Sequence, residues 1–125
     1  MIYTDEFLRV EFEESEVAWV KIFTNNEAKE ISQLCEKTRE RLFRAALVCE
    51  RAMIEFYKPE KVNWASFANY CPRVHIHIQA RFKDDSFFPE SMWGVKQREG
   101  AKRELKKPEF SRFLSERLSA EFGEK

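Results

Sequence analysis

Two stretches near the N-terminus alternate between apolar and polar residues. In residues 7–13 the apolar positions are Leu8, Val10 and Phe12, and the residues between them are charged. Successive side chains of a strand point to opposite faces, so this pattern predicts a strand with one buried face. Residues 17–23 are predicted as a second strand, and the acidic stretch 13–16 as the turn between the two.

A helical repeat follows in residues 35–57, which contain neither Gly nor Pro. Apolar residues recur there at the spacing of one helix face. They are Leu42, Ala45, Ala46, Cys49, Met53 and Phe56. Pro59 is expected to end the helix, because proline disfavours a helical conformation in the residue before it.

Two further strands are predicted at 62–69 and 74–82, joined by a turn at 69–72. The charged stretch 95–107 is expected to be a solvated connector or a partly ordered tail. Pro108 fits the first turn of a last helix, whose apolar face would be Phe110, Phe113, Leu114, Leu118 and Phe122. Strands and helices do not alternate as in parallel βαβ units, so we expect an α+β fold with an antiparallel sheet.

Charge and composition narrow the function classes. The 22 basic and 22 acidic residues cancel, which argues against a nucleic-acid partner. Residues 1–60 carry 9 Lys/Arg and 13 Asp/Glu, a net charge of −4, and residues 61–125 carry +4. This asymmetry is a weak sign of an anionic ligand in the second half. No apolar run is long enough for a membrane. With no signal peptide and an odd number of cysteines (Cys35, Cys49, Cys71), we expect a reducing cytoplasm.

The strand predicted at 74–82 is the segment with the most chemical potential. Its alternation places the apolar residues Val74, Ile76, Ile78, Ala80 and Phe82 on one face. His75, His77, Gln79 and Arg81 then lie in a row on the other face. Imidazole and guanidinium groups on a rigid strand can hold phosphate oxygens, and a neutral imidazole can attack phosphorus.

Four interpretations of this row remain open on the residues alone. The pair of histidines can be polar strand residues without a role, or metal ligands that lack an obvious third partner. They can also perform phosphate chemistry, or only bind a nucleotide. Arg73 and Arg81 can bind phosphate, face solvent or form ion pairs.

The surrounding residues carry a more specific signal. Residues 63–85 contain the pattern N-x-A-x-x-x-N-x-x-P-x-x-H-x-H-x-x-A-R-F-x-x-D, and residues 89–94 contain P-x-x-x-W-G. This pattern resembles the histidine-triad (HIT) family, and within it a bacterial subgroup similar to diadenosine tetraphosphate hydrolases. The resemblance covers about residues 7–95.

The resemblance implies particular roles for the matched residues. His75 would be the middle histidine and would attack the α-phosphate, with His77 bonding a phosphate oxygen or the leaving group. Asn69 matches a phosphate-contacting residue. Asn63, Arg73 and Gln79 are further candidates for nucleotide contacts.

Three departures from the family are visible. Arg73 stands in place of the first histidine, Gln79 replaces an apolar residue, and Ala68 replaces a glycine. A second register, H-x-H-x-Q, would make His77 the nucleophile, as in the nucleotidyltransferase branch of the family. More flanking residues agree with the first register.

The resemblance also implies the architecture and the activity. It predicts a HIT-like antiparallel sheet of about five strands with one long helix, in a domain at 1–95. Residues 96–125, which have no counterpart in the resemblance, are expected to add the charged connector and the C-terminal amphipathic helix. The implied activity is hydrolysis or transfer at a phosphoanhydride or phosphoramidate, such as a dinucleoside polyphosphate. The alternative is a nucleotide-binding protein without turnover. No cofactor or bound metal is expected. A homodimer is expected, in which Trp93 packs near the partner's site or is a plain core or interface tryptophan.

Overall fold

The computed structural model describes residues 1–123 and contains five strands and two α-helices in that range. The strands are β1 (Tyr3–Thr4), β2 (Leu8–Phe12), β3 (Trp19–Thr24), β4 (Lys61–Ala65) and β5 (His75–Arg81). The helices are α1 (Glu36–Tyr57) and α2 (Lys107–Phe122), with a short 3₁₀ helix, η1, at Ile31–Gln33. The predicted α+β class with a five-stranded sheet is therefore confirmed.

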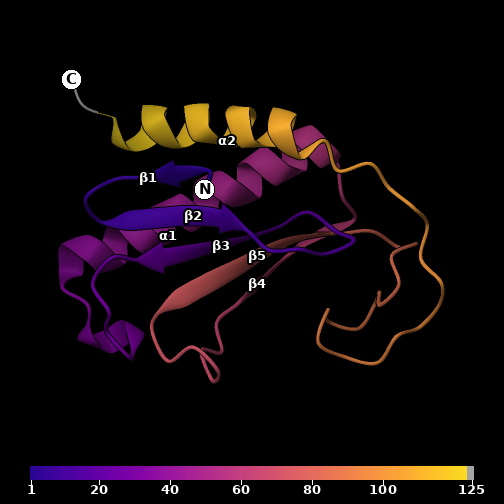
Figure 1. The fold of residues 1–125 in the computed structure, drawn as a ribbon, viewed down its shortest axis with the longest axis horizontal. Helices are drawn as coiled ribbons and strands as arrows, with labels where there is room; N and C mark the ends of the chain where they lie inside the picture. Colours follow the sequence, from indigo (N-terminus) through magenta and orange to yellow (C-terminus); the bar gives the residue numbers. More distant parts are fainter. Residues whose placement is uncertain (124–125) are drawn as a thin grey trace.

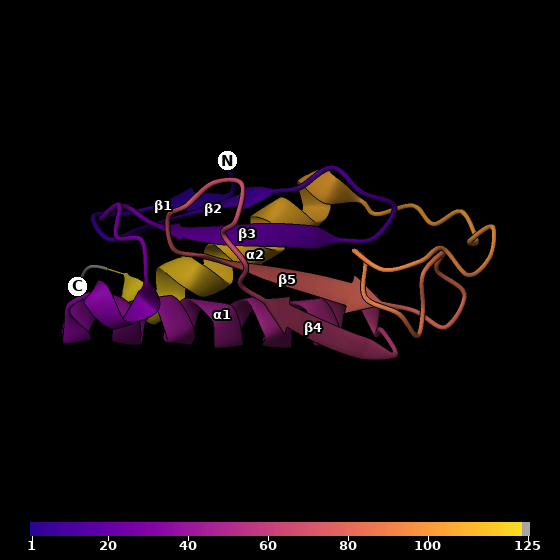
Figure 2. The same ribbon diagram turned by 90° about the horizontal axis from the view of Figure 1, so that it is seen from below.

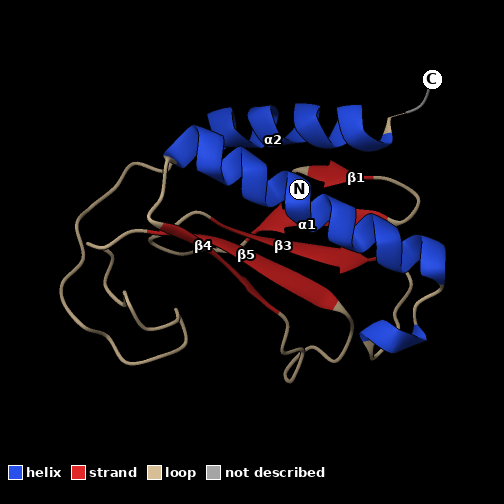
Figure 3. Cartoon of the chain, turned by 180° about the vertical axis from the view of Figure 1, so that it is seen from behind, coloured by secondary structure: helices blue, strands red, loops and turns tan. Residues whose placement is uncertain are grey.

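The strands form one antiparallel sheet in the order β1-β2-β3-β5-β4. Figure 1 looks onto the face of the sheet that carries no helix, and α1 lies behind it. The view from below in Figure 2 and the view from behind in Figure 3 show α1 crossing the strands, with α2 on the same side. The sheet thus has one face closed by helices and a second face available for a site.

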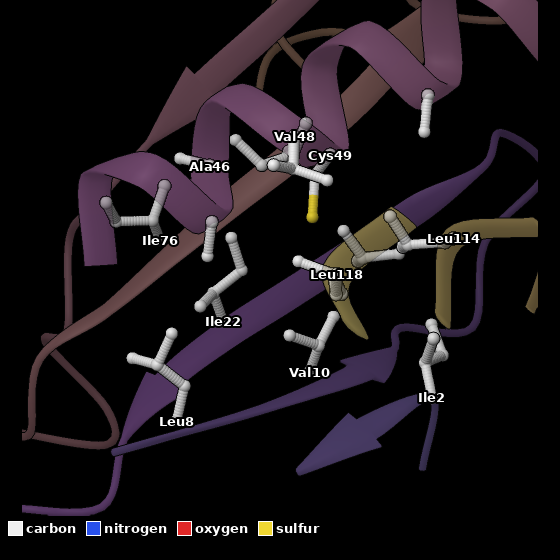
Figure 4. Close-up of a cluster of buried hydrophobic side chains, with 14 of the residues drawn as sticks. Ile2, Leu8, Val10, Ile22, Ala46, Val48, Cys49, Ile76, Leu114 and Leu118 are labelled. Carbon is white, nitrogen blue, oxygen red and sulfur yellow. The ribbon is translucent and has the colours of Figure 1, made fainter. Parts of the chain in front are cut away.

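The core lies between the two helices and the sheet. Leu8, Val10 and Ile22 from the strands meet Cys49 from α1 and Leu118 from α2 (Figure 4), and each is buried. Because α2 contributes to the same core as α1, it packs on the body of the protein. The division into a domain at 1–95 and a connector and helix at 96–125 stays a prediction.

The elements differ from the predicted ones at three places. The strand predicted at 62–69 ends at Ala65, because the chain turns away before Ala68, whose φ of 53° lies in the left-handed region. The two-residue β1 and the short η1 were not predicted. The charged stretch 95–106 has no helix or strand, but its backbone is held, because Gln97 and Arg98 donate to the Ser86 carbonyl.

The end of α1 agrees with the prediction that Pro59 stops it. The last helical residue is Tyr57, and the C-cap residue Lys58 adopts a left-handed conformation with φ 50°. Its N–H still bonds the Ile54 carbonyl at 3.1 Å. The chain can then turn into β4, which forms the edge of the sheet next to β5.

Candidate functional site

The face of β5 opposite α1 carries the row predicted from the sequence, but much of it is buried. Register pairs bring His75 opposite Phe23, His77 opposite Lys21 and Gln79 opposite Trp19. His75 is only 6% exposed, and Gln79 and Arg81 are each 1% exposed. The 82–106 segment contributes to this burial, since Trp93 contacts His77 and Asp85 pairs with Arg81. His77 itself stays partly exposed.

The ring of His75 is held in one orientation by a backbone bond and an aromatic neighbour. Its Nδ1 atom lies 2.9 Å from the Arg73 carbonyl oxygen. A carbonyl oxygen can only accept, so Nδ1 carries the proton. In the neutral ring the lone pair then resides on Nε2, which is the nitrogen able to attack an electrophile. Phe23 stacks on the ring, with centroids 4.6 Å apart and planes 20° apart.

His77 is held in the opposite tautomer. Its Nδ1 accepts a hydrogen bond of 2.9 Å from the Trp19 indole N–H, so in the neutral ring the proton is on Nε2. Burial lowers the pKa of His77 to about 4, and the neighbouring His75 and Lys21 add to this effect, against an opposing contribution from Glu13. At neutral pH His77 is therefore an uncharged donor through Nε2–H.

Aromatic side chains surround the His77 ring. Trp93 meets it edge-on at a centroid distance of 5.0 Å, and it also contacts Trp19 at 5.1 Å and Phe67 at 4.9 Å. Trp93 is 44% exposed. The contact of Trp93 with His77 is made within one chain, whereas the sequence led us to place this tryptophan beside a partner's site or in the core.

Two adjoining hollows open at this site and share Phe67 and Trp93. The first, of about 350 Å³, is bounded by both histidines and by the 67–71 segment. We call it the histidine compartment. The second, of about 460 Å³, is bounded by residues of β4 and by Gln79. We call it the amide compartment, because Asn63 and Gln79 both line it.

The predicted nucleotide-contacting residues are divided between these hollows. Asn69 is exposed and lines the histidine compartment, while Asn63 and Gln79 line the amide compartment. Arg73 lines neither. Its guanidinium donates to the Thr24 carbonyl at 2.7 Å and lies 3.5 Å from the Glu27 carboxylate. Its backbone carbonyl, not its side chain, serves the site by holding His75.

Arg81 forms a buried ion pair, which decides among its three predicted roles. Its Nε and Nη2 bond the two oxygens of Asp85 at 2.9 and 3.0 Å, and its Nη1 donates to Asn63 at 2.9 Å. Burial alone would raise the pKa of Asp85. Bonds from Arg81 and from three backbone N–H groups outweigh that effect and hold the pKa at about 2. The pair anchors the turn that leads to Trp93.

Sequence reasoning missed Trp19 and Phe23 as parts of the site and treated them as core residues. A signal for them existed in the alternation of residues 17–23. Val20 and Ile22 face the core, so the residues between and beside them face the histidines. This signal identifies site residues only if β3 is known to pair with β5. The two strands are more than 50 residues apart in the sequence, so the pattern of either strand does not reveal the pairing.

Further features of the described residues bear on the other predictions. Within residues 1–123 no group of three His, Cys, Asp or Glu side chains is placed to hold a metal ion. In the same range no helix combines the length and the apolar character that crossing a membrane requires. Cys71, beside the histidine compartment, is exposed and carries a free thiol.

Solved structures of histidine triad proteins share this architecture. One from Bradyrhizobium japonicum aligns with a TM-score of 0.78 at 26% identity, over 94% of this chain and 88% of that chain. One from Marinobacter aquaeolei VT8 aligns with a TM-score of 0.77 at 21% identity, over 94% and 88%. One from Sinorhizobium meliloti 1021 gives 0.70 at 21%, over 95% and 86%.

The chain has the histidine-triad fold. These neighbours support the family to which the motifs of residues 63–85 pointed. The sequence matches no protein-family model and no curated protein. The histidine-triad fold also accounts for the extent of the alignment, which covers more of the chain than the 7–95 region expected from the motifs.

Ala68 shows what one departure from the histidine-triad pattern costs. Its φ of 53° is a conformation that glycine adopts freely and alanine does not. The resemblance places a glycine at this position, directly before Asn69. The 66–74 segment therefore carries the strain that a side chain adds in this conformation.

The hydrogen bond from Trp19 to His77 leads to a prediction about pH. Replacing Trp19 with phenylalanine removes the donor that stabilises the neutral imidazole, so the pKa of His77 should rise. A rise of roughly 0.5–1 unit corresponds to one hydrogen bond of about 1 kcal/mol. An NMR titration of the His77 ring measures it. Trp64→Phe, at a tryptophan bonded to Glu50, is the matched control and should leave this pKa in place.

The sign of the accompanying stability change follows from the pKa. In the folded protein His77 has a pKa of about 4, below its ordinary value of 6.5. The unfolded chain therefore binds more protons between these values, and the free energy of unfolding should fall as pH drops from 6.5 through 4. In Trp19→Phe the pH range over which the free energy of unfolding falls should be narrower, because the pKa of His77 in the folded protein lies closer to 6.5. A pKa of His77 that stays at 4 or falls in the variant would contradict the tautomer derived from the hydrogen bond.

Proposed function

We propose that this protein is a nucleotide hydrolase or transferase that acts through a nucleotidyl-histidine intermediate on His75. The substrate is a phosphoanhydride, such as a dinucleoside polyphosphate, or a phosphoramidate. The expected compartment of the protein is still the reducing cytoplasm. The observation that carries the proposal is the pair of opposed tautomers. His75 presents a lone pair on Nε2, and His77 presents an N–H on Nε2.

In the first step the Nε2 lone pair of His75 attacks the α-phosphorus and forms an N–P bond. The bond from phosphorus to the leaving group breaks, and its electron pair leaves with that group. The hydrogen bond that Nδ1–H of His75 donates to the Arg73 carbonyl stabilises the positive ring that results. In the second step the oxygen of a water molecule bonds phosphorus and the N–P bond breaks, so that Nε2 recovers its lone pair. The nucleotide departs with the oxygen of water, and the proton that the water loses passes to the solvent.

His77 contributes an electrostatic role in this scheme. Its Nε2–H can bond an oxygen of the phosphate or of the leaving group, where negative charge develops in the transition state. The alternative in which His77 is the nucleophile requires a lone pair on Nε2. The indole N–H of Trp19 occupies Nδ1 and favours the tautomer that lacks it, which supports His75 in this role.

Incubation with diadenosine tetraphosphate and with adenosine 5′-phosphoramidate tests the proposal through release of AMP. Turnover of either substrate supports an enzyme. Binding of nucleotide, seen as a higher Tm, without release of AMP would support a nucleotide-binding protein without turnover. The orientation of Arg73 toward Thr24, away from both compartments, favours that second candidate. A protein that neither turns over these substrates nor binds nucleotide would contradict both candidate functions.

We also propose a homodimer built on α1 and the β4 edge of the sheet. Helix α1 exposes three large apolar residues, which are Phe43 (39% exposed), Leu47 (42%) and Ile54 (50%). They lie on the helix that packs beside β4, and Phe43 stacks on Trp64 of that strand at a centroid distance of 6.5 Å. An unpaired edge strand next to an exposed apolar stripe is a surface that a second copy can cover.

Leu47→Glu should convert the dimer to a monomer, because it places a charge in an apolar interface. Sedimentation at micromolar concentration measures the change. Val95→Glu is the matched control, since Val95 is 73% exposed in the connector and outside the proposed interface. A wild-type protein that sediments as a monomer would contradict the dimer, as would a dimer that survives Leu47→Glu.

A further inference from the structure

The amide compartment lies next to His77 and has polar groups that the chemistry above does not use. Gln79 follows His77 on the same face of β5, and Asn63 on β4 is its register partner. Both side chains line the compartment, together with Lys61. Trp93 and Phe67 bound both compartments. A group leaving the phosphorus beside His77 can therefore extend directly between Gln79 and Asn63.

Gln79 supplies the observation that points to a ligand. Its side chain is 1% exposed, and its Nε2 atom has no hydrogen-bond partner among residues 1–123. A buried donor without an acceptor destabilises the folded protein. The terminal torsion of glutamine is broad, so the amide can turn toward an acceptor that enters the compartment. Retaining such a donor is explained if a bound molecule supplies the acceptor.

Asn63 presents a second donor in the same place. Arg81 can only donate, so the oxygen of Asn63 must face it, at 2.9 Å. This leaves the N–H groups of the Asn63 amide for the compartment. The ammonium group of Lys61 adds positive charge, although it also donates to the Val62 carbonyl at 3.2 Å. The compartment therefore offers donors suited to an anion.

One carboxylate also lines the compartment. Glu50 accepts a hydrogen bond of 2.9 Å from the Trp64 indole, which engages one of its oxygens. Its charge opposes an anionic ligand, whereas Gln79, Asn63 and Lys61 favour one. The donors outnumber this carboxylate, and all three lie on the adjacent strands β4 and β5, whose pairing fixes their spacing.

The state of His77 adds an argument that does not depend on the amides. An imidazole held neutral by Trp19 donates a hydrogen bond but is too weak an acid to transfer its proton. A leaving group must then depart as a stable anion. A phosphate oxygen does so at neutral pH, whereas an amine must gain a proton. This favours cleavage of a phosphoanhydride over cleavage of a phosphoramidate.

We infer that the amide compartment binds the leaving group of the substrate through the oxygens of its terminal phosphate, and that Gln79 determines specificity for such leaving groups. This inference rests on the proposed function. In the first step the N–P bond to His75 forms, the P–O bond of the anhydride breaks, and the electron pair stays on the departing phosphate oxygen. No proton is transferred, and the new negative charge lies beside the donors of Gln79, Asn63 and His77.

The test compares Gln79→Glu with the wild type on two substrates. The variant has the same shape, but it loses the donor and adds a negative charge. Diadenosine tetraphosphate has a leaving group that reaches the amide compartment, and adenosine 5′-phosphoramidate has a leaving group that does not. The ratio of kcat/KM for the first substrate to that for the second should fall by about 10–100-fold, the value of one hydrogen bond to a charged group. Gln97→Glu, on the exposed connector, is the matched control for the added charge.

A binding measurement separates this inference from the proposed function. Inorganic tripolyphosphate should raise the Tm of the wild type, and this stabilisation should be lost in Gln79→Glu but kept in Gln97→Glu. That binding result supports the inference even if neither nucleotide is turned over. Absence of turnover would overturn only the proposed function. The inference would be overturned if the ratio of kcat/KM for diadenosine tetraphosphate to that for adenosine 5′-phosphoramidate were the same in Gln79→Glu as in the wild type. So would tripolyphosphate that binds neither protein or binds both equally.

Discussion

Replacing His75 with alanine is expected to reduce AMP release by at least about 1,000-fold, because the variant has no nitrogen to form the covalent intermediate. The chain should still fold, since the core on the opposite face of β5 is untouched. Far-UV circular dichroism and the urea midpoint check this. His77→Ala should retain the covalent intermediate and lose about 100-fold, which is the usual effect of removing one donor to a developing negative charge.

Added imidazole provides a control for the role of the His75 side chain. A smaller variant, His75→Gly, leaves space beside Phe23 for a free imidazole, which should restore part of the lost turnover. Rescue is expected for His75→Gly and not for His77→Gly. If His77→Ala abolishes the intermediate while His75→Ala retains it, the register with His77 as the nucleophile is correct.

Replacing Asp85 with alanine should cause the largest loss of stability among single substitutions at this site. The substitution leaves the buried guanidinium of Arg81 without its partner and removes the acceptor of three backbone N–H groups, those of Phe82, Phe87 and Phe88. Breaking a buried pair in this way costs about 3–5 kcal/mol. Urea denaturation at neutral pH measures it.

Two comparisons make this prediction specific. Asp85→Asn keeps an acceptor for part of the network and should cost less than Asp85→Ala. Glu11→Gln removes a partly exposed pair with Arg9 and should cost less than about 1 kcal/mol. If Asp85→Ala were no more destabilising than Glu11→Gln, the turn at 82–88 would not depend on the buried pair.

Asp85→Ala should also affect the site through Asn63. Arg81 fixes the amide of Asn63 by donating to its oxygen, and it does so from a position set by Asp85. Loss of the pair therefore releases a donor of the amide compartment. Even where the variant folds, KM for diadenosine tetraphosphate should rise more than kcat falls.

The sequence was most informative where a local pattern determines the structure. Residues 35–57 were predicted as a helix, and α1 occupies 36–57. The strand predicted at 74–82 is β5 at 75–81. Both follow from periodicity in neighbouring residues, which needs no knowledge of the rest of the chain. The apolar positions of β5 face the core as predicted, and the histidines lie on the other face.

Properties that depend on distant residues or on the conformation of irregular loops could not be predicted in this way. The tautomer of His77 is set by Trp19, which is 58 positions earlier in the chain. The ion pair of Arg81 depends on how the 82–85 turn closes. The chain also leaves β4 at Ala65 because Ala68 adopts a left-handed conformation, which the Val62–Asn69 pattern does not reveal. Chemistry at this site therefore follows from contacts that only the fold provides.

The most direct test of the account is to locate the covalent intermediate. The wild type is mixed with diadenosine tetraphosphate, quenched at alkaline pH, where phosphorus–nitrogen bonds persist, and digested. Cleavage after Arg73 and Arg81 gives a peptide that contains both histidines, so fragmentation must assign the adduct within residues 74–81. The proposed mechanism requires adenylate on His75. Adenylate on His77, or turnover with no adduct on either histidine, would contradict it.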